Sequence, residues 1–258
     1  METVNHFVPP ALNSSVQTSE TGRTFMLQFY GVPTFPGKSR VFAGFISNMK
    51  LPAPLARLSL AFDWVFHLGQ QVVLDSDAFL LHVQERLLQQ SQGGWRRSFY
   101  LPASADTGVI KFRTWFDEVG GGAVPWPAGA PASLGPVLPR EVVMDRYTQH
   151  VKSCKSCRRA VAWIERLSAA CGALAAVAAP VGAWSLLTAA LSGGGLLPFL
   201  KTGAAAAGAG QAAAGQQAAI ALGWPMLLLA AGALFARHKL QGLWRRFHFM
   251  DYVHANVE

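Results

Sequence analysis

The chain has 258 residues, of which 51% are hydrophobic and only 14% are charged. An average soluble domain has about 25% charged residues, so the composition disfavours an ordinary one-piece soluble globule. Three cysteines are too few for a disulfide scaffold. The excess positive charge lies in residues 151–258, with ten Lys/Arg against three Asp/Glu, whereas residues 1–150 have twelve against eleven. Because this charge flanks long uncharged runs, we expect a membrane protein and no nucleic-acid partner.

The first half of the chain predicts a mixture of strands and helices. Residues 24–47 predict a β-hairpin, because two strand-like runs flank the turn residues of GVPTFPGKSR. Helical spacing of apolar residues predicts further segments at about 55–69, 75–90 and 106–119. Five prolines between 125 and 139 mark a linker, and a helix is expected to begin after them.

The second half predicts a membrane anchor. Two uncharged runs, 167–200 and 202–236, can each supply one transmembrane helix, which we place near 165–190 and 216–236. A Gly/Ala-rich connection joins them; a buried hairpin in a soluble protein is the alternative. Nine Lys/Arg lie at the outer flanks and Lys201 alone lies in the connection, so both ends are expected on one side of the membrane. Four aromatic residues of the tail are expected at the membrane interface: Trp244, Phe247, Phe249 and Tyr252.

Cys154 and Cys157 form a C-x2-C motif beside the first span. The favoured interpretation is a reversible dithiol, because the surrounding Lys and Arg side chains would stabilise a thiolate. With His150 as a third ligand the pair would instead be part of a metal site, and a packing role alone is the remaining alternative. His67 and His82 are expected to be ordinary positions on amphipathic helices.

Two aspartates stand on opposite faces of the helix expected at 75–90. Asp77 shares a face with Leu81 and Gln84, whereas Asp75 lines up with Arg86 on a more polar stripe. Asp77 is therefore expected to project toward the apolar side, where a carboxylate needs a metal, a cation or hydrogen bonds. A helix cap is the simpler interpretation of Asp77, and Asp75 is expected to be a cap or a solvated charge at the helix N-terminus.

Several segments together resemble the C-terminal part of the pheophorbide a oxygenase family, which are plastid, membrane-anchored Rieske-type oxygenases. The segments are VPTFPGKSR (32–40), LDSDAFLLHVQE (74–85), LPASADTGVIKFRTWF (101–116), MDRYTQHVKSCKSC (144–157) and FHFMDYVHANVE (247–258). The resemblance covers nearly the whole chain. Because a paired-span anchor follows the C-x2-C, it is specific to this family among Rieske oxygenases.

The resemblance implies an α+β fold, with helices on an antiparallel sheet. It divides the chain into an incomplete catalytic domain (1–138), a C-x2-C helix (139–160), a transmembrane hairpin (161–238) and a basic aromatic tail (239–258). In full-length members of the family, a Rieske [2Fe–2S] cluster held by two Cys and two His passes electrons to a mononuclear Fe(II). That iron is held by two histidines and one carboxylate, and the family pattern places the carboxylate on Asp77.

This chain has no C-x-H…C-x2-H arrangement, so the Rieske cluster and the two iron-binding histidines are expected upstream of residue 1. The resemblance then implies the C-terminal portion of an oxygenase acting on a chlorophyll-derived tetrapyrrole. It would lie in a chloroplast membrane (envelope or thylakoid) with its soluble part facing the stroma. Its implied partners are a ferredoxin-like electron donor and a thioredoxin-like reductant, and it is compatible with a homo-oligomer. The alternative is a non-catalytic plastid membrane protein that uses Cys154 and Cys157 as a redox-sensing or binding module.

Overall fold

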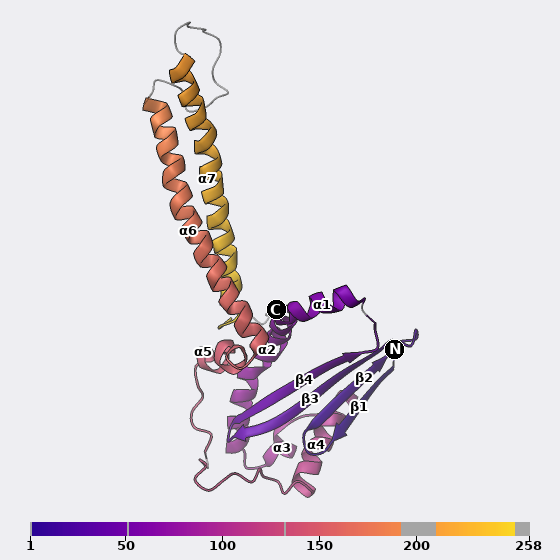
Figure 1. Ribbon diagram of the computed structural model, residues 1–258. Coiled ribbons are helices and arrows are strands. Elements are labelled where there is room, and N and C mark those ends of the chain that lie inside the picture. The colour runs from indigo at the N-terminus through magenta and orange to yellow at the C-terminus, as the bar shows by residue number, and fades with distance from the viewer. Residues whose placement is uncertain (1, 51, 132, 192–209, 251–258) are drawn as a thin grey trace. The chain divides into compact units, whose positions relative to one another are not determined.

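The computed structural model describes residues 2–50, 52–131, 133–191 and 210–250 (Figure 1). Its contacts divide the chain into two compact units. The first unit comprises Met1–Phe62 and Val73–Val143, and the second comprises Asp63–Val72 and Met144–Glu258. The long helix α2 (Asp63–Gln90) contributes its first ten residues to the second unit and the rest to the first. The four-part division drawn from the sequence remains a prediction.

The first unit is built on an antiparallel sheet with the strand order β1-β2-β3-β4 (Figure 1). The strands are β1 (Glu2–Val8), β2 (Leu12–Thr18), β3 (Thr24–Phe35) and β4 (Lys38–Ser47). The hairpin expected at 24–47 is confirmed, since β3 and β4 pair from Phe25↔Ser47 to Phe35↔Lys38. Gly37 turns the chain with φ +74°, a conformation that glycine adopts without steric cost. β1 and β2 were not predicted.

In the sequence of the first unit, the helices follow the four strands. They are α1 (Ala53–Ala61), α2 from Val73, α3 (Gly94–Ser98), the short η1 (Ser104–Asp106), α4 (Thr107–Glu118) and α5 (Arg140–Val143). α4 ends just before the glycine run, as predicted, and packs on β1. The Phe7 ring meets Phe112 and Trp115 edge-on, with centroids 5.4 and 5.6 Å apart. The α+β class is therefore confirmed.

The first unit leaves much of its apolar surface exposed. Among the described residues, the fully buried hydrophobic side chains all belong to the second unit. Large apolar side chains of the sheet that are at least 40% exposed are Val4, Val8, Phe25, Tyr30, Phe35, Val41, Phe42 and Ile46. Soluble domains seldom expose so many neighbouring apolar groups without a partner.

Within the first unit, α2 buries its polar stripe and exposes its apolar one. Arg86 is buried and its guanidinium donates hydrogen bonds to the carbonyls of Leu134 (3.0 Å), Gly135 (3.2 Å) and Pro136 (3.1 Å). One turn earlier, His82 accepts the Leu138 N–H at Nε2 (3.0 Å). These bonds fasten the segment at 134–138 to the helix.

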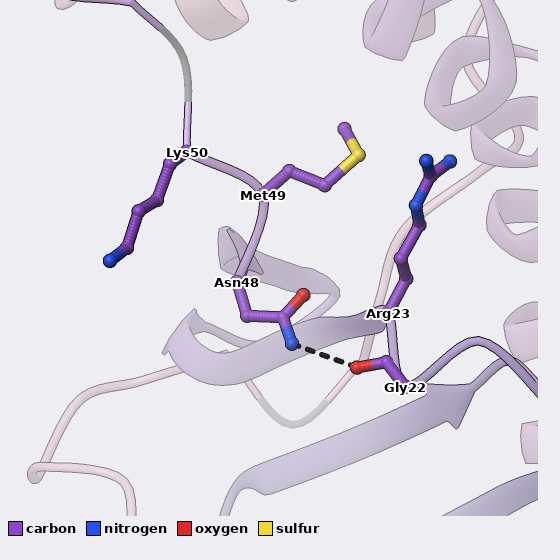
Figure 2. A pocket seen from close by; sticks show the side chains of 5 residues that line it. All are labelled: Gly22, Arg23, Asn48, Met49 and Lys50. Atoms are coloured by element: carbon purple, nitrogen blue, oxygen red, sulfur yellow. Dashed lines mark hydrogen bonds between the residues drawn. The ribbon is translucent and has the colours of Figure 1, made fainter.

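A surface pocket lies where the sheet meets the segment that leads to α1 (Figure 2). It is lined by Gly22, Arg23, Asn48, Met49 and Lys50. The Asn48 side chain donates to the Gly22 carbonyl (3.0 Å) and accepts the Thr24 N–H (3.0 Å). Because both ends of its side-chain amide are hydrogen-bonded to the backbone, Asn48 links the end of β4 to the β2–β3 turn.

The second unit contains the hairpin of α6 (Lys155–Leu191) and α7 (Gly210–Arg245), which lie side by side (Figure 1). Both are long and apolar enough to cross a membrane. Small residues bring the two helices together: a Cβ on Gly182 would lie 2.9 Å from the Gly223 carbonyl oxygen. Alanines 175, 178, 230 and 233 are buried in the same contact, whereas Val177, Trp184, Leu228 and Phe235 face outward. The predicted hairpin is confirmed; its connection, 192–209, lies outside the described residues.

Two expectations for the second half change. The helix expected after residue 139 is interrupted: α5 ends at Val143, and a π-helical turn, η2 (Tyr147–Val151), precedes α6. Phe247 is not an interfacial residue, because it is fully buried (0% exposed) and packs against Trp64 at 5.8 Å between ring centroids. Tyr252 lies outside the described residues.

Candidate metal centre

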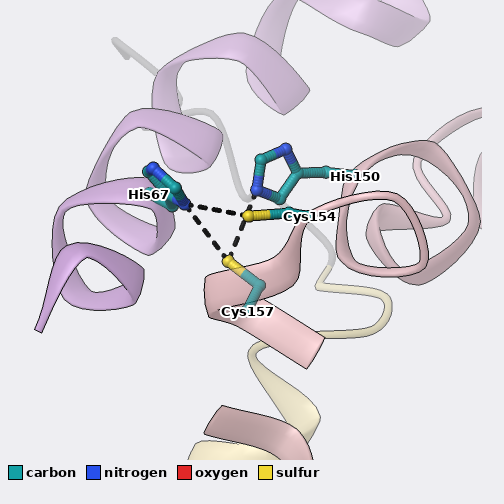
Figure 3. A group of neighbouring side chains, drawn as sticks. All are labelled: His67, His150, Cys154 and Cys157. Atoms are coloured by element: carbon teal, nitrogen blue, oxygen red, sulfur yellow. Dashed lines mark hydrogen bonds between the residues drawn. The ribbon is translucent and has the colours of Figure 1, made fainter. Parts of the chain in front are cut away.

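Two cysteines and two histidines of the second unit converge on one point (Figure 3). His67 comes from the first turns of α2, and His150 from η2. Cys154 stands immediately before α6, and Cys157 lies in its first turn. One ligand atom from each of the four side chains lies within 4.8 Å of every other.

The backbone between His150 and α6 sets the spacing of three of these side chains. The Cys154 N–H donates to the carbonyls of His150 (3.0 Å) and Val151 (3.2 Å), which folds the chain back on itself. The Cys154 carbonyl then accepts the Arg158 N–H (3.0 Å) as α6 begins. The H-x3-C-x2-C spacing therefore places His150, Cys154 and Cys157 on the same side of a tight turn.

His67 completes the group from a distant part of the chain. Its Nδ1 lies 3.4 Å from both the Cys154 Sγ and the Cys157 Sγ, 87 and 90 residues away in sequence. The Nε2 of His150 lies 3.4 Å from the Cys157 Sγ. Cys154, Cys157 and Cys171 form no disulfide in the structure.

The surroundings of the group are apolar. Cys157 is 1% exposed and belongs to a buried cluster with Val151, Ala160, Val161, Ile164 and Phe247. Burial, followed by the neighbouring Cys154, raises the pKa of the Cys157 thiol well above its ordinary value. The cations that were expected to favour its thiolate, Lys152, Lys155, Arg158 and Arg159, are exposed to solvent. The reversible dithiol stays a prediction. Burial, His67 and Arg146 lower the pKa of His150, which keeps its imidazole neutral at pH 7.

The two aspartates exchange the environments expected for them. α2 is continuous through this segment, so Asp75 lies in its middle and not at a helix start. Asp75 is 3% exposed, whereas Asp77 is exposed beside Leu80 (56%) and Leu81 (58%). They stand on opposite faces of the helix, as the spacing indicated. Asp77 does lie with the apolar stripe, but that stripe is the open face of α2.

Sequence reasoning identified Cys154, Cys157 and, as an alternative, His150, but missed His67. A histidine on an amphipathic helix carries no local signal of a partner that lies far along the chain. The only available hint was the position of His67 on the polar side of a helix otherwise rich in apolar residues.

Comparison with known proteins gives the family. The family model described as pheophorbide a oxygenase matches residues 7–95, a segment that contains both aspartates. The chain is 35% identical to the protochlorophyllide-dependent translocon component 52 of Arabidopsis thaliana, over 61% of this chain and 28% of the relative. It is 32% identical to flavonoid 8-hydroxylase 2 of Ocimum basilicum, over 72% of this chain and 39% of the relative.

A third relative extends the likeness over most of the chain. The pheophorbide a oxygenase of Oryza sativa subsp. japonica is 26% identical over 89% of this chain and 40% of its own length. In each case the chain spans less than half the length of the curated relative that it matches. No solved structure matches the chain with significance.

Proposed function

We propose that this chain, which belongs to the pheophorbide a oxygenase family, is the C-terminal portion of a Rieske-type, membrane-bound oxygenase. In this proposal the complete enzyme inserts oxygen into a chlorophyll-derived tetrapyrrole. The observation that carries it is the family match over 7–95, which covers β2, β3, β4, α1, α2 and Asp77.

The exposed apolar surface of the first unit supports the proposal. A sheet whose Phe42 and Ile46 are more than half exposed needs further chain to cover it. The chain also matches at most 40% of the length of the three relatives described above. In the complete enzyme, other residues of the catalytic domain would cover this sheet and the open face of α2.

Asp77 is proposed as the carboxylate ligand of the mononuclear Fe(II). Its side chain projects from the open face of α2, between Val73 and Leu81, where the remainder of the domain would pack. Bound iron supplies oxygen activation, and it requires two imidazoles beside the carboxylate. The described residues place no histidine pair beside Asp77, and the nearby His82 lies on the other face, bonded to Arg86 and Leu138. The described part of the chain therefore offers one ligand of three, and we assign it no reaction step of its own.

The His67, His150, Cys154 and Cys157 group does not fit a Rieske cluster. In that cluster, the two thiolates and the two imidazoles bind different irons at opposite ends. Here the imidazole nitrogens lie 3.4 Å from the sulfurs, a spacing that suits ligands of a single ion. The proposal accordingly places the [2Fe–2S] cluster in the part of the enzyme outside this chain.

The hairpin of α6 and α7 is proposed to anchor the enzyme in a chloroplast membrane, envelope or thylakoid, with the first unit on the stromal side. The support is the chloroplast location in the relatives' names and the positive charge at the outer ends of both helices. Protease added to the stromal face of sealed membranes should remove residues 1–150 and leave a protected hairpin. Cleavage within 192–209 from that face would contradict the orientation.

Electron-transfer and redox partners are part of the same proposal. A ferredoxin-like protein would supply electrons to the complete enzyme, and a thioredoxin-like dithiol would reduce a Cys154–Cys157 disulfide in a two-electron exchange. The half-buried Cys154 is the sulfur that such a partner reaches, because Cys157 is buried. Association into a homo-oligomer is compatible with the exposed faces of the first unit.

The proposal is tested by the coding sequence upstream of residue 1. It predicts an in-frame C-x-H…C-x2-H motif followed by a histidine pair, and turnover of a tetrapyrrole by the protein assembled from both parts. An in-frame stop codon directly upstream would instead favour the non-catalytic redox module. Hydroxylation of a flavonoid without turnover of any tetrapyrrole would contradict the substrate class.

A further inference from the structure

We propose that His67, His150, Cys154 and Cys157 bind one Zn²⁺ ion in a tetrahedral, structural site. The inference does not depend on the oxygenase proposal, because it uses ligands of the second unit alone. It concerns a metal different from those of the two iron centres of the complete enzyme.

The separations between ligand atoms match those of a tetrahedral zinc site. With Zn–S of about 2.3 Å and Zn–N of about 2.0–2.1 Å, tetrahedral angles require S···N separations of about 3.6 Å. Three of the four S···N separations are 3.4 Å in the structure, and the fourth is no longer than 4.8 Å. Four side chains from three segments therefore already surround a volume of the correct size, and only small shifts of the rings are needed.

The chemistry of the ligands selects the metal. Two thiolates and two imidazoles exclude Mg²⁺ and Ca²⁺, which prefer oxygen ligands. A closed set of four Cys and His ligands is typical of structural zinc, whereas a catalytic zinc keeps one position open. Zn²⁺ with two thiolates is electrically neutral, which suits a site where Cys157 is 1% exposed among apolar side chains.

The position of the site defines its structural role. His67 brings the start of α2, and the two cysteines bring the start of α6. Next to them, Trp64 packs on Phe247 at the end of α7. One ion would join segments 90 residues apart in sequence, next to the start of α6. Such cross-links stabilise a fold by closing a long loop.

Zinc binding and disulfide formation exclude each other, because both use the sulfurs of Cys154 and Cys157. The zinc-loaded state is the reduced state, and its thiolates are shielded from alkylating reagents. Zinc would therefore protect the pair, and a disulfide would form only in the zinc-free protein.

The test is metal analysis of the complete 258-residue chain, purified in detergent under reducing conditions without chelators. The expected result is about one zinc per chain with negligible iron. X-ray absorption at the zinc edge should show two sulfurs at about 2.3 Å and two nitrogens at about 2.0–2.1 Å. Substoichiometric zinc, iron as the bound metal, or an oxygen-rich ligand shell would overturn the proposal.

Variants distinguish a four-ligand site from non-specific zinc binding by the two thiols alone. His67→Gln and Cys154→Ser should lose zinc, whereas His82→Gln on the same helix and Cys171→Ser should retain it. His67→Cys should keep one zinc with a third sulfur in its spectrum, which shows that loss in His67→Gln is not misfolding. Full zinc retention in His67→Gln would refute the site as described.

Discussion

Arg86 provides the sharpest stability prediction for the first unit. Its three groups of N–H donors hold the carbonyls of Leu134, Gly135, Pro136 and His82, the last at 2.7 Å. Two of these donor groups, Nε and Nη2, reach the carbonyls at 134–136, whereas the third bonds His82 within α2. At a net contribution of about 1 kcal/mol for each of the two, Arg86→Met should lower the stability of this attachment by about 2 kcal/mol. Arg86→Lys should retain a part of it, since an ammonium cannot span the carbonyls as a guanidinium does.

Hydrogen exchange measured by mass spectrometry reports the stability of the contact between residues 134–138 and α2. A loss of about 2 kcal/mol corresponds to roughly thirtyfold faster exchange in residues 134–140, which include the Leu138 N–H bonded to His82. The control is Arg57→Met, which removes an exposed arginine of α1. If Arg86→Met leaves exchange in 134–140 as slow as in the unchanged chain, the reasoning fails.

Two further predictions concern pH and helix packing. Burial, and then Arg86, lowers the pKa of His82, so the unfolded state binds more protons on acidification. The stabilisation from neutral His82 should be complete above about pH 6.5 and decline as pH falls below it. The thermal unfolding temperature should fall over the same pH range. In His82→Gln this pH-dependent fall should be absent. In the hairpin, a Cβ at Gly223 would lie 2.6 Å from the Leu186 side chain, whereas one at Gly232 meets nothing within 4 Å. Gly223→Leu should destabilise the helix pair by about 1–3 kcal/mol in detergent unfolding, and equal effects of Gly232→Leu would contradict this packing.

The strands show where local sequence is sufficient and where it is not. β3 and β4 were predictable because apolar runs flank a Pro-Gly turn. β2, LNSSVQT, is polar and short, and its extended conformation depends on pairing with β1 and β3 on either side. Such pairing is a property of the sheet and leaves little signal in the strand itself.

Helix α2 shows a different limit. Spacing correctly placed Asp75 and Asp77 on opposite faces, because helical periodicity is fixed by the backbone. Which face is buried depends on the rest of the protein, and here the stripe with Asp75 and Arg86 is buried while Leu81 is open. The usual rule that the apolar stripe faces the core does not hold for this stretch of α2.

The metal centre combines a local and a distant component. The H-x3-C-x2-C spacing indicated three of its members, since one turn of backbone brings them together. His67 joins through packing of the start of α2, which no periodicity reports. Sequence proximity also does not reveal that the cations near the cysteines are exposed to solvent while Cys157 is buried.

The most direct measurement of the proposed function is the iron content of the complete enzyme with Asp77→Asn. Electron paramagnetic resonance distinguishes the two centres, since the reduced Rieske cluster and the nitric oxide adduct of the mononuclear Fe(II) give separate signals. Glu85→Gln is the matched control, because Glu85 is an exposed carboxylate on the same helix. We predict that Asp77→Asn loses turnover and the mononuclear signal but retains the Rieske signal, and that Glu85→Gln retains all three. Retention of the mononuclear iron signal in Asp77→Asn would contradict the assignment of this ligand.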